Sequence, residues 1–284
     1  MRVSFVAEVS SNHNQDIERC KSFIEAAAKI GCSAVKFQLF KVDKLFAPEI
    51  LSKSDEHRRR KRWELPVEFL PIIAAKCKEC GIQFSCTPFY LEAVDELRPY
   101  IDFYKIASYE LFRTDLITAC VDTGKPVVLS TGMATLDEVR RAVDNIQRAG
   151  CSDFTLLHCV SGYPTPAKEC NLSAVDTLRK NFACNVGWSD HSVNAGVIYR
   201  AVFRWGAEMI EFHLDLDEKG AEYLSGHCWL PRQIEPVITG INDGLIADGN
   251  GLKVPAACEI ADRDWRADPV DGLRPLRTIR ENWR

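Results

Sequence analysis

The amino-acid sequence predicts an α/β fold, a single (β/α)8 TIM barrel, and three observations support this prediction. The chain has 284 residues, close to the roughly 250 that such a barrel takes. Eight short apolar segments recur along it, each followed by a pattern typical of a helix, so the sheet should be parallel with helices between its strands. Glycines stand where these helices should end, at Gly31, Gly81, Gly124, Gly150 and Gly206.

The predicted strands are almost continuously apolar, as strands buried on both faces should be. Amphipathic stretches between them predict crossover helices, for example over residues 17–30, 136–149 and 193–205. Eight such units close a barrel. The strands are predicted over residues 3–7, 34–38, 82–86, 103–106, 126–130, 154–158, 185–187 and 209–212.

Two regions depart from this repeating unit. Residues 39–66 form a long, charged connection after the second strand, and such connections are commonly lids or mobile excursions. The residues after Lys253 are rich in arginine, aspartate, proline and tryptophan and show no strand or clear helix pattern. We therefore expect a catalytic barrel domain over residues 1–252 and a C-terminal extension over residues 253–284 that forms no separate domain.

Composition and charge argue against several classes of function. The formal net charge of −4 argues against a general nucleic-acid binder. The one basic run, residues 57–62, is short and has acidic neighbours, so it is interpreted as a solvated loop or helix face. The sequence opens without the pattern of a signal peptide, and no apolar run approaches the roughly 20 residues that span a membrane. A cytoplasmic location is expected.

The twelve cysteines are scattered, and several lie inside apolar segments. This distribution favours free thiols buried in a reducing cytoplasm over a disulfide framework. The one CxxC pair, Cys77 and Cys80, ends a helical pattern and has no second pair, so it indicates zinc only weakly.

The chemistry of a (β/α)8 barrel lies at the carboxyl ends of its strands. Lysines and hydroxyls there suit a small phosphorylated anion, and histidines beside carboxylates suit a divalent metal ion. The polar or aromatic residues at or just after the ends of the predicted strands are Glu8, Ser10, Asn12, His13, Lys36, Gln38, Thr87, Phe89, Lys105, Ser108, Glu110, Ser130, Thr131, His158, Ser161, Tyr163, Ser189, Asp190, His191, Glu211 and His213.

Each of these residues also has a purely structural interpretation. Lys36 alone would more often be a strand-end lysine that reaches solvent, and His213 alone could be a hydrogen-bonded barrel histidine. His158, in the apolar LLHCV, is interpreted as a core histidine, whereas His227 in SGHCW could contact substrate or pack in the core. Many such groups converge at one end of the barrel. This favours a functional site, because otherwise every one of these residues would need a purely structural role at the same time.

Eight motifs, in order, carry a resemblance to the sialic acid (N-acetylneuraminate) synthase family. AEVSSNHN resembles that family's AEIGxNHNG opening, and IEFHLDLD resembles its eighth-strand motif; between them stand VKFQ, CTPF, YKIAS, LSTGM, LLHCVSGYPTP and GWSDHS. The resemblance spans residues 3–240. It implies an enzyme that condenses phosphoenolpyruvate with an open-chain aldose, N-acetylmannosamine-like or related. The products would be phosphate and a 2-keto-3-deoxy sugar acid of the nonulosonic or sialic type.

The resemblance also implies a role for each matching residue. His191 and His213 correspond to the ligands of a divalent metal ion, Mn²⁺ or Mg²⁺. Glu8 corresponds to the catalytic acid/base, and Lys36 and Lys105 would neutralise the phosphate and carboxylate. The residues that would bind phosphoenolpyruvate or line the sugar site are Gln38, Thr87, Phe89, Ser108, Glu110, Ser130, Ser161, Tyr163, Ser189 and Glu222.

The sequence departs from the family pattern in three places. Ser161 stands where asparagine is usual, so one phosphoenolpyruvate contact should differ. After the eighth strand, KGAEYLSGHCWLP replaces the usual GPDH, and Glu222 is the nearest equivalent of a sugar-binding aspartate. The small antifreeze-like C-terminal domain of that family, which supplies an arginine to the sugar in the partner subunit, has no counterpart here. The sugar is therefore left open.

Other interpretations also stay open. One is a metal-dependent barrel aldolase or isomerase that does not use phosphoenolpyruvate, with Lys36 or Lys105 as a Schiff-base lysine; another is a non-catalytic sugar-binding homologue. The arginine-rich tail is either a solvated extension or a lid over a barrel mouth. The expected partners are phosphoenolpyruvate and a small sugar, with no nucleic acid and no membrane. A homodimer is one expected assembly.

Overall fold

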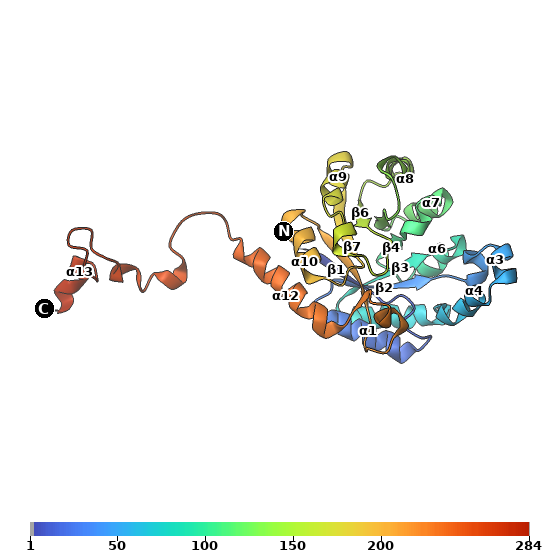
Figure 1. The fold of residues 1–284 in the computed structure, drawn as a ribbon, viewed down its shortest axis with the longest axis horizontal. Coiled ribbons are helices and arrows are strands. Elements are labelled where there is room, and N and C mark those ends of the chain that lie inside the picture. Colours follow the sequence, from blue (N-terminus) through green and yellow to red (C-terminus); the bar gives the residue numbers. More distant parts are fainter. Residues whose placement is uncertain (1–2, 284) are drawn as a thin grey trace. The chain divides into compact units, whose positions relative to one another are not determined.

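The computed structural model describes residues 3–283. Eight parallel strands pair in sequence order, and β1 also pairs with β8, so the sheet closes into the predicted (β/α)8 barrel (Figure 1). The strands are β1 (Ser4–Glu8), β2 (Ala34–Leu39), β3 (Gln83–Pro88), β4 (Phe103–Ile106), β5 (Val127–Ser130), β6 (Phe154–Cys159), β7 (Asn185–Asp190) and β8 (Met209–Leu214).

Helices connect the strands and surround the sheet (Figure 1). The first begins at Asp16, whose carboxylate accepts hydrogen bonds from the backbone N–H groups of Glu18 and Arg19. The predicted helix ends are confirmed, because all five glycines have a left-handed φ; Gly81, with φ 70°, ends α5. The helices of the repeating unit are α1 (Ile17–Lys29), α5 (Leu70–Cys80), α6 (Leu91–Leu97), α7 (Thr114–Asp122), α8 (Leu136–Arg148), α9 (Ala174–Asn181), α10 (Ala195–Tyr199) and α12 (Pro231–Ala247).

Several elements differ from the sequence-based expectation. The helix predicted over residues 193–205 is α10 followed by a π-helical turn, Arg200–Arg204. The seventh strand does not end at residue 187, because its pairing with β8 continues through Asp190. Short elements fill the two longest irregular connections, and they are α2 (Val42–Leu45), α3 (Pro48–Lys53), α4 (Asp55–Arg59), α11 (Ala221–Leu224) and β9 (Cys228–Trp229), which pairs with β8.

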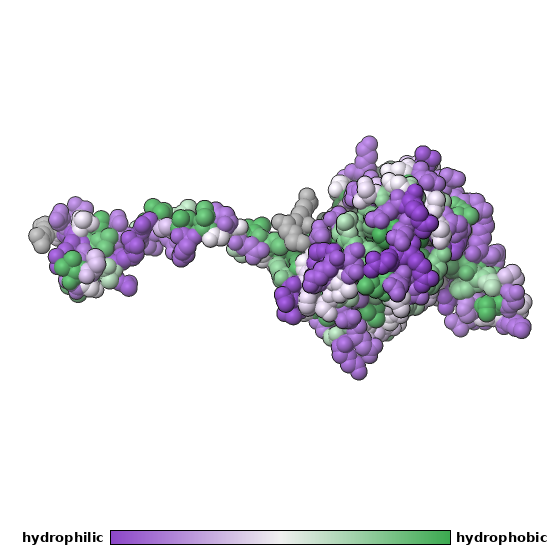
Figure 2. Space-filling view, turned by 90° about the horizontal axis from the view of Figure 1, so that it is seen from above, coloured by the Kyte–Doolittle hydropathy of each residue, from purple (hydrophilic) through white to green (hydrophobic). Residues whose placement is uncertain are grey.

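Two compact units divide the chain, one ending at Gly244 and the other beginning at Leu245. The second unit contains a helix that the sequence did not predict, α13 (Arg277–Arg280), and ion pairs of Asp271 with Arg277 and Arg280 stabilise its fold. No helix within residues 3–283 has the length and apolar composition needed to cross a membrane. Figure 2 shows hydrophobic residues among hydrophilic ones on the surface of the second unit, where Leu252, Val254, Ile260, Trp265, Val270, Leu273 and Trp283 are exposed.

An apolar layer fills the inside of the barrel. Five of its residues form one buried cluster although they come from five different strands, which is possible only if they point toward the barrel axis. Because side chains alternate along a strand, the residue two positions later points into the same interior, closer to the carboxyl end. The members of the layer are Val6, Ala34, Phe103, Val128 and Leu157, with Met209 packed against them.

Candidate active site

A polar layer lies directly above this apolar layer, toward the carboxyl ends of the strands. It brings together two lysines and two carboxylates that are far apart in the sequence, and all its members are buried. Stacked interior layers are typical of this fold. Each member stands two residues after an apolar one: Glu8 after Val6, Lys36 after Ala34, Lys105 after Phe103, Ser130 after Val128, Cys159 after Leu157 and Glu211 after Met209.

Ion pairs connect the four charges. Lys36 contacts Glu8, and its Nζ lies 4.0 Å from Oε2 of Glu211, whereas Lys105 Nζ lies 3.5 Å from Oε1 of the same carboxylate. Burial lowers the pKa of Lys36, but Glu211 and Glu8 outweigh it and hold that pKa above its ordinary value. For Lys105, burial is the larger effect and lowers the pKa despite Glu211. Lys105 is therefore the less stabilised cation of the two.

Hydroxyl groups gather around Gly132, just after β5. The backbone N–H of Gly132 donates to Ser108 Oγ at 3.0 Å. A Cβ atom at Gly132 would come within 2.4 Å of Ser161 Oγ and 2.8 Å of Ser108 Oγ, so glycine is needed for these hydroxyls to approach the backbone. The buried hydroxyls of Ser130 and Ser161 have no hydrogen-bond partner among residues 3–283. Unpaired buried donors beside a lysine form a cradle suited to an anion.

The two predicted metal ligands lie next to each other at the mouth. The ring centroids of His191 and His213 are 5.3 Å apart, and the Tyr163 ring lies 4.1 Å from that of His191. Nδ1 of His191 lies 2.8 Å from the carbonyl oxygen of Val160. Because a carbonyl only accepts, Nδ1 carries the hydrogen and Nε2 keeps a free lone pair. His191 follows Asp190, whose carboxylate accepts from two tryptophan N–H groups and so fixes this turn.

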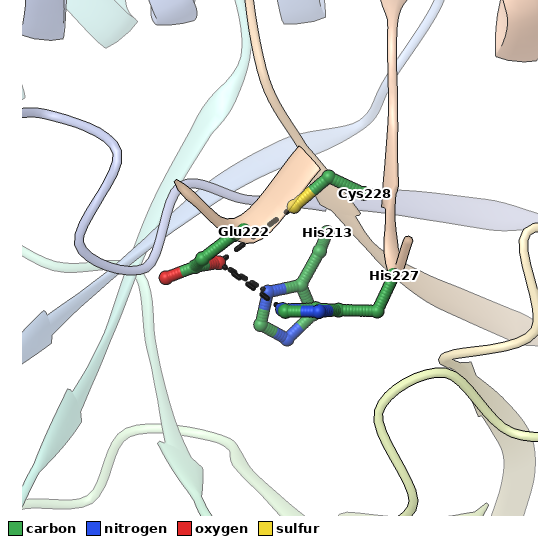
Figure 3. A group of neighbouring side chains, drawn as sticks. All are labelled: His213, Glu222, His227 and Cys228. Atoms are coloured by element: carbon green, nitrogen blue, oxygen red, sulfur yellow. Dashed lines mark hydrogen bonds and ion pairs between the residues drawn. The ribbon is translucent and has the colours of Figure 1, made fainter. Parts of the chain in front are cut away.

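Glu222, on α11, connects the segment after β1 with the segment after β8. Its Oε1 accepts from the hydroxyls of Ser10 and Ser11 at 2.6 and 2.7 Å. Its Oε2 lies 3.1 Å from Nδ1 of His213 and 3.5 Å from Nε2 of His227 (Figure 3). Contacts with these two histidines hold the pKa of Glu222 well below its ordinary value, although burial raises it.

A cavity of 370 Å³ opens beside Glu222. Arg60 lines it and stacks on the rings of Phe46 and Trp63, with its guanidinium carbon 5.3 and 5.6 Å from their centroids. The Nε of Arg60 is buried and has no hydrogen-bond partner within the described chain. Residues 57–62 are mostly exposed, as the sequence indicates, and within this run the Arg60 side chain is 34% exposed and packs on two aromatic rings. The other lining residues are Ser10, Ser11, Gln38, Phe40, Leu45, Trp63, Ala221, Glu222 and Ser225.

The remaining predicted residues lie around these groups. Gln38 Nε2 donates to Glu8 Oε1 at 2.7 Å, and Lys36 Nζ lies 3.3 Å from Thr87 Oγ1. Ser189 donates to Glu211 at 3.1 Å. Phe89 packs edge-on against the cavity residue Phe40. Glu110 is buried, which raises its pKa to about 7, and its Oε2 has no hydrogen-bond partner in the part of the chain described.

Sequence reasoning missed some members of this region. His227 was left between two interpretations, and the structure places it against Glu222, next to Cys228. Arg60 was missed because it lies in a run of basic residues that is typical of a solvated surface. The signal that could have found it is Trp63, three positions later, on whose ring Arg60 packs. His158 is confirmed as a core histidine, since its Nε2 bonds to the carbonyl oxygen of Cys170 at 2.9 Å.

Comparison with known proteins identifies a family and several relatives of this chain. The model of the NeuB family matches residues 23–253. An uncharacterised protein of Methanocaldococcus jannaschii is 36% identical, over 89% of this chain and 74% of its own. The N,N'-diacetyllegionaminic acid synthase of Campylobacter jejuni is 33% identical, over 89% of this chain and 80% of its own.

A solved structure is similar along most of the chain. The crystal structure of N-acetylneuraminic acid synthetase from Leptospira borgpetersenii superposes with a TM-score of 0.81 at 28% identity. The match covers 94% of this chain and 92% of that one. The protein therefore belongs to the NeuB family, the sialic acid synthase family that its eight motifs predict.

Proposed function

We propose that this protein is a transferase that condenses phosphoenolpyruvate with an open-chain aldose, N-acetylmannosamine-like or related. The products are phosphate and a 2-keto-3-deoxy sugar acid of the nonulosonic type. Relatives named as N,N'-diacetyllegionaminic acid synthases support this class of reaction. The observation that carries the proposal is the buried cradle of Lys36, Lys105 and the hydroxyls of Ser130 and Ser161, which have no hydrogen-bond partner among the described residues.

Phosphoenolpyruvate fits this cradle by charge and by hydrogen bonding. Its phosphate and carboxylate oxygens accept, and the lysines and hydroxyls donate. Lys105 gains most, because burial disfavours its cation until an anion arrives. We assign the phosphoenolpyruvate contacts to Lys36, Lys105 and the hydroxyls of Thr87, Ser108, Ser130, Ser161 and Ser189.

Glu8 is the group to which we assign proton transfer. The enol carbon of phosphoenolpyruvate bonds to the aldehyde carbon, the aldehyde oxygen takes up a proton to become a hydroxyl, and positive charge develops at the carbon that bears phosphate. Water adds there, loses a proton, and phosphate leaves. Glu8 Oε1 is already oriented by Gln38 and by the backbone N–H of Ser10, so the carboxylate is positioned to take that proton or to stabilise the cation.

His191 and His213 are assigned as ligands of a divalent ion, Mn²⁺ or Mg²⁺. The donor chemistry fits, since Nε2 of His191 has a free lone pair and His213 lies beside the carboxylate of Glu222. Such an ion, when bound, polarises the aldehyde of the sugar. We assign Gln38, Phe89, Glu110, Tyr163 and Glu222 to the sugar site.

One observation favours a second candidate, a barrel aldolase with a Schiff-base lysine. The lowered pKa of Lys105 makes its neutral amine, the nucleophilic form, easier to reach. An aldolase would release no phosphate from phosphoenolpyruvate. Borohydride would instead trap a carbonyl substrate on Lys105.

Phosphate release from phosphoenolpyruvate across a panel of aldoses, with and without Mn²⁺, tests the proposal. We expect release only with an aldose and a divalent ion present. Release with no aldose at all would point to a simple phosphatase. No release with any aldose, together with borohydride trapping on Lys105, would replace the synthase by the aldolase.

A further inference from the structure

Four potential metal donors surround one carboxylate oxygen in the segment after β8 (Figure 3). The donor atoms of His213, Glu222, His227 and Cys228 all lie within 4.8 Å of one another. From Glu222 Oε2, the distances are 3.1 Å to His213 Nδ1, 3.5 Å to His227 Nε2 and 3.7 Å to Cys228 Sγ. Two donors on one tetrahedral ion, at bond lengths of about 2.0–2.3 Å, lie about 3.3–3.8 Å apart. Glu222 Oε2 therefore lies close to ligand-to-ligand spacing from each of the other three donors.

The hydrogen bonds of Ser225 determine how His227 presents its ring. The Ser225 hydroxyl donates its single proton to the carbonyl oxygen of Glu222 at 2.8 Å. It can therefore only accept from Nδ1 of His227, 2.7 Å away, so Nδ1 carries the hydrogen. In the neutral ring, Nε2 then points a lone pair at a carboxylate oxygen. Two electron-rich atoms that face each other repel, and either a proton on Nε2 or a metal ion bound to both atoms relieves this repulsion.

We propose that Glu222 and His227 bind a divalent transition-metal ion together with His213, and that Cys228 is its fourth donor. Nitrogen, oxygen and sulfur donors together favour ions such as Zn²⁺, Co²⁺ or Fe²⁺ over Mg²⁺, which prefers oxygen. The inference refines the metal centre of the proposed function and rests on that function for the task of the ion.

A different arrangement would place Glu222 one step away from the ion. There, His213 Nδ1 would donate to Glu222 and bind metal through its other nitrogen, as carboxylate–histidine–metal chains do. That arrangement explains the His213 contact, but it leaves the lone pair of His227 facing the carboxylate. A proton on His227 Nε2 would also resolve that contact, and the metal titration below separates the two cases.

The test is Co²⁺ binding to the chelator-treated full chain, without phosphoenolpyruvate or sugar. We expect one ion per chain and a thiolate-to-cobalt charge-transfer band in the near ultraviolet. Cys228→Ser should remove the band and keep the stoichiometry. His227→Ala should weaken Co²⁺ binding strongly. The loss should exceed the effect of removing a residue that only hydrogen-bonds to a metal ligand, which is about 10–100-fold. Matched controls are His57→Ala, in the charged segment after β2, and Cys258→Ser, an exposed thiol of the second unit.

Two outcomes would overturn the inference. One is a wild-type Co²⁺ spectrum without a thiolate band; because this measurement needs no substitution, it remains decisive even if a variant misfolds. The other is a His227→Ala protein that binds Co²⁺ within tenfold of the wild type. Either result leaves the phosphate-release assay unaffected. Conversely, a Co²⁺ site of the expected kind in a protein that condenses no aldose would refute the proposed function alone.

Discussion

Replacing Glu8 by glutamine tests the proposed chemistry directly, because it removes a charge while keeping the shape of the side chain. The remaining carbonyl oxygen can still accept from Gln38 and from the backbone of Ser10, which now contact Oε1 at 2.7 and 3.0 Å. The ion pair with Lys36 is lost. The variant should therefore fold and keep the site's shape.

Two magnitudes follow from this geometry. In the variant, Lys36 still has Glu211 at 4.0 Å. The free energy of unfolding should therefore fall by about 1–3 kcal/mol, less than the about 3–5 kcal/mol lost when a buried charge is left without any partner. For a protein of this size, that lowers Tm by about 2–10 °C. Loss of a positioned acid/base should lower kcat by about 10²–10⁴-fold, or about 3–5 kcal/mol of transition-state stabilisation.

Steady-state phosphate release at saturating aldose measures the catalytic effect, and a thermal melt measures the structural one. We expect kcat to fall by the stated factor while KM for phosphoenolpyruvate changes little, since the lysines and hydroxyls remain. Glu18→Gln, a carboxylate in the first turn of α1, is the matched control. An unchanged kcat with a raised KM would refute the reasoning and make Glu8 a binding residue.

Three further predictions concern the metal, a buried acid and the cavity. His191→Ala or His213→Ala should abolish Mn²⁺ binding in equilibrium dialysis while circular dichroism shows an intact barrel. Burial raises the pKa of Glu110 from 4.5 to about 7, so the folded protein loses stability as pH rises between these values, where the carboxyl of the unfolded chain ionises first. Glu110→Gln should remove this loss, which is roughly 3 kcal/mol at most. The variant should therefore have a higher Tm than the wild type at pH 8 but not at pH 4. Arg60→Gln should raise KM for the sugar about 10–100-fold, the worth of one charged hydrogen bond, in the phosphate-release assay.

Each of these has a contrary result. Full activity of a histidine variant after chelation would mean that the assigned ligands are wrong. Equal melting curves for Glu110→Gln and the wild type at pH 8 would show that Glu110 ionises without cost. An unchanged sugar KM in Arg60→Gln would leave Arg60 a structural role against Phe46 and Trp63. For the last variant, Arg59→Gln is a neighbouring control that does not line the cavity.

Most of the fold could be predicted because buried parallel strands are apolar throughout and glycine ends their helices. The ends of the strands could not be predicted in the same way. β7 continues through Ser189 and Asp190, which are polar, as loop residues often are, although their backbones still pair with β8. The π-helical turn after α10 has no counterpart in the hydrophobic pattern, because its i+5 bonding depends on local packing.

The site was predictable wherever its residues lie within or directly after a strand. Glu8, Lys36 and Lys105 lie where the strand pattern places them, and the structure brings them together; their roles stay predictions. His227 could not be interpreted, because its position depends on β9 pairing beside β8, which is a tertiary event. Arg60 could not be found for a similar reason, since its stacking partner Phe46 lies fourteen positions earlier, across two short helices.

The two-residue step between the apolar and polar layers has a consequence for changes in chain length. A one-residue deletion just before Lys36 in β2 would turn Lys36 out of the barrel and move the buried Phe37 to the opposite face, because side chains alternate. The same deletion would thus remove a charged group and open the core at once. Substitutions can alter activity and stability separately in these strands, but insertions and deletions cannot. Natural length variation in such a protein should therefore be confined to the connections, where the segment that carries Glu222 and His227 also lies.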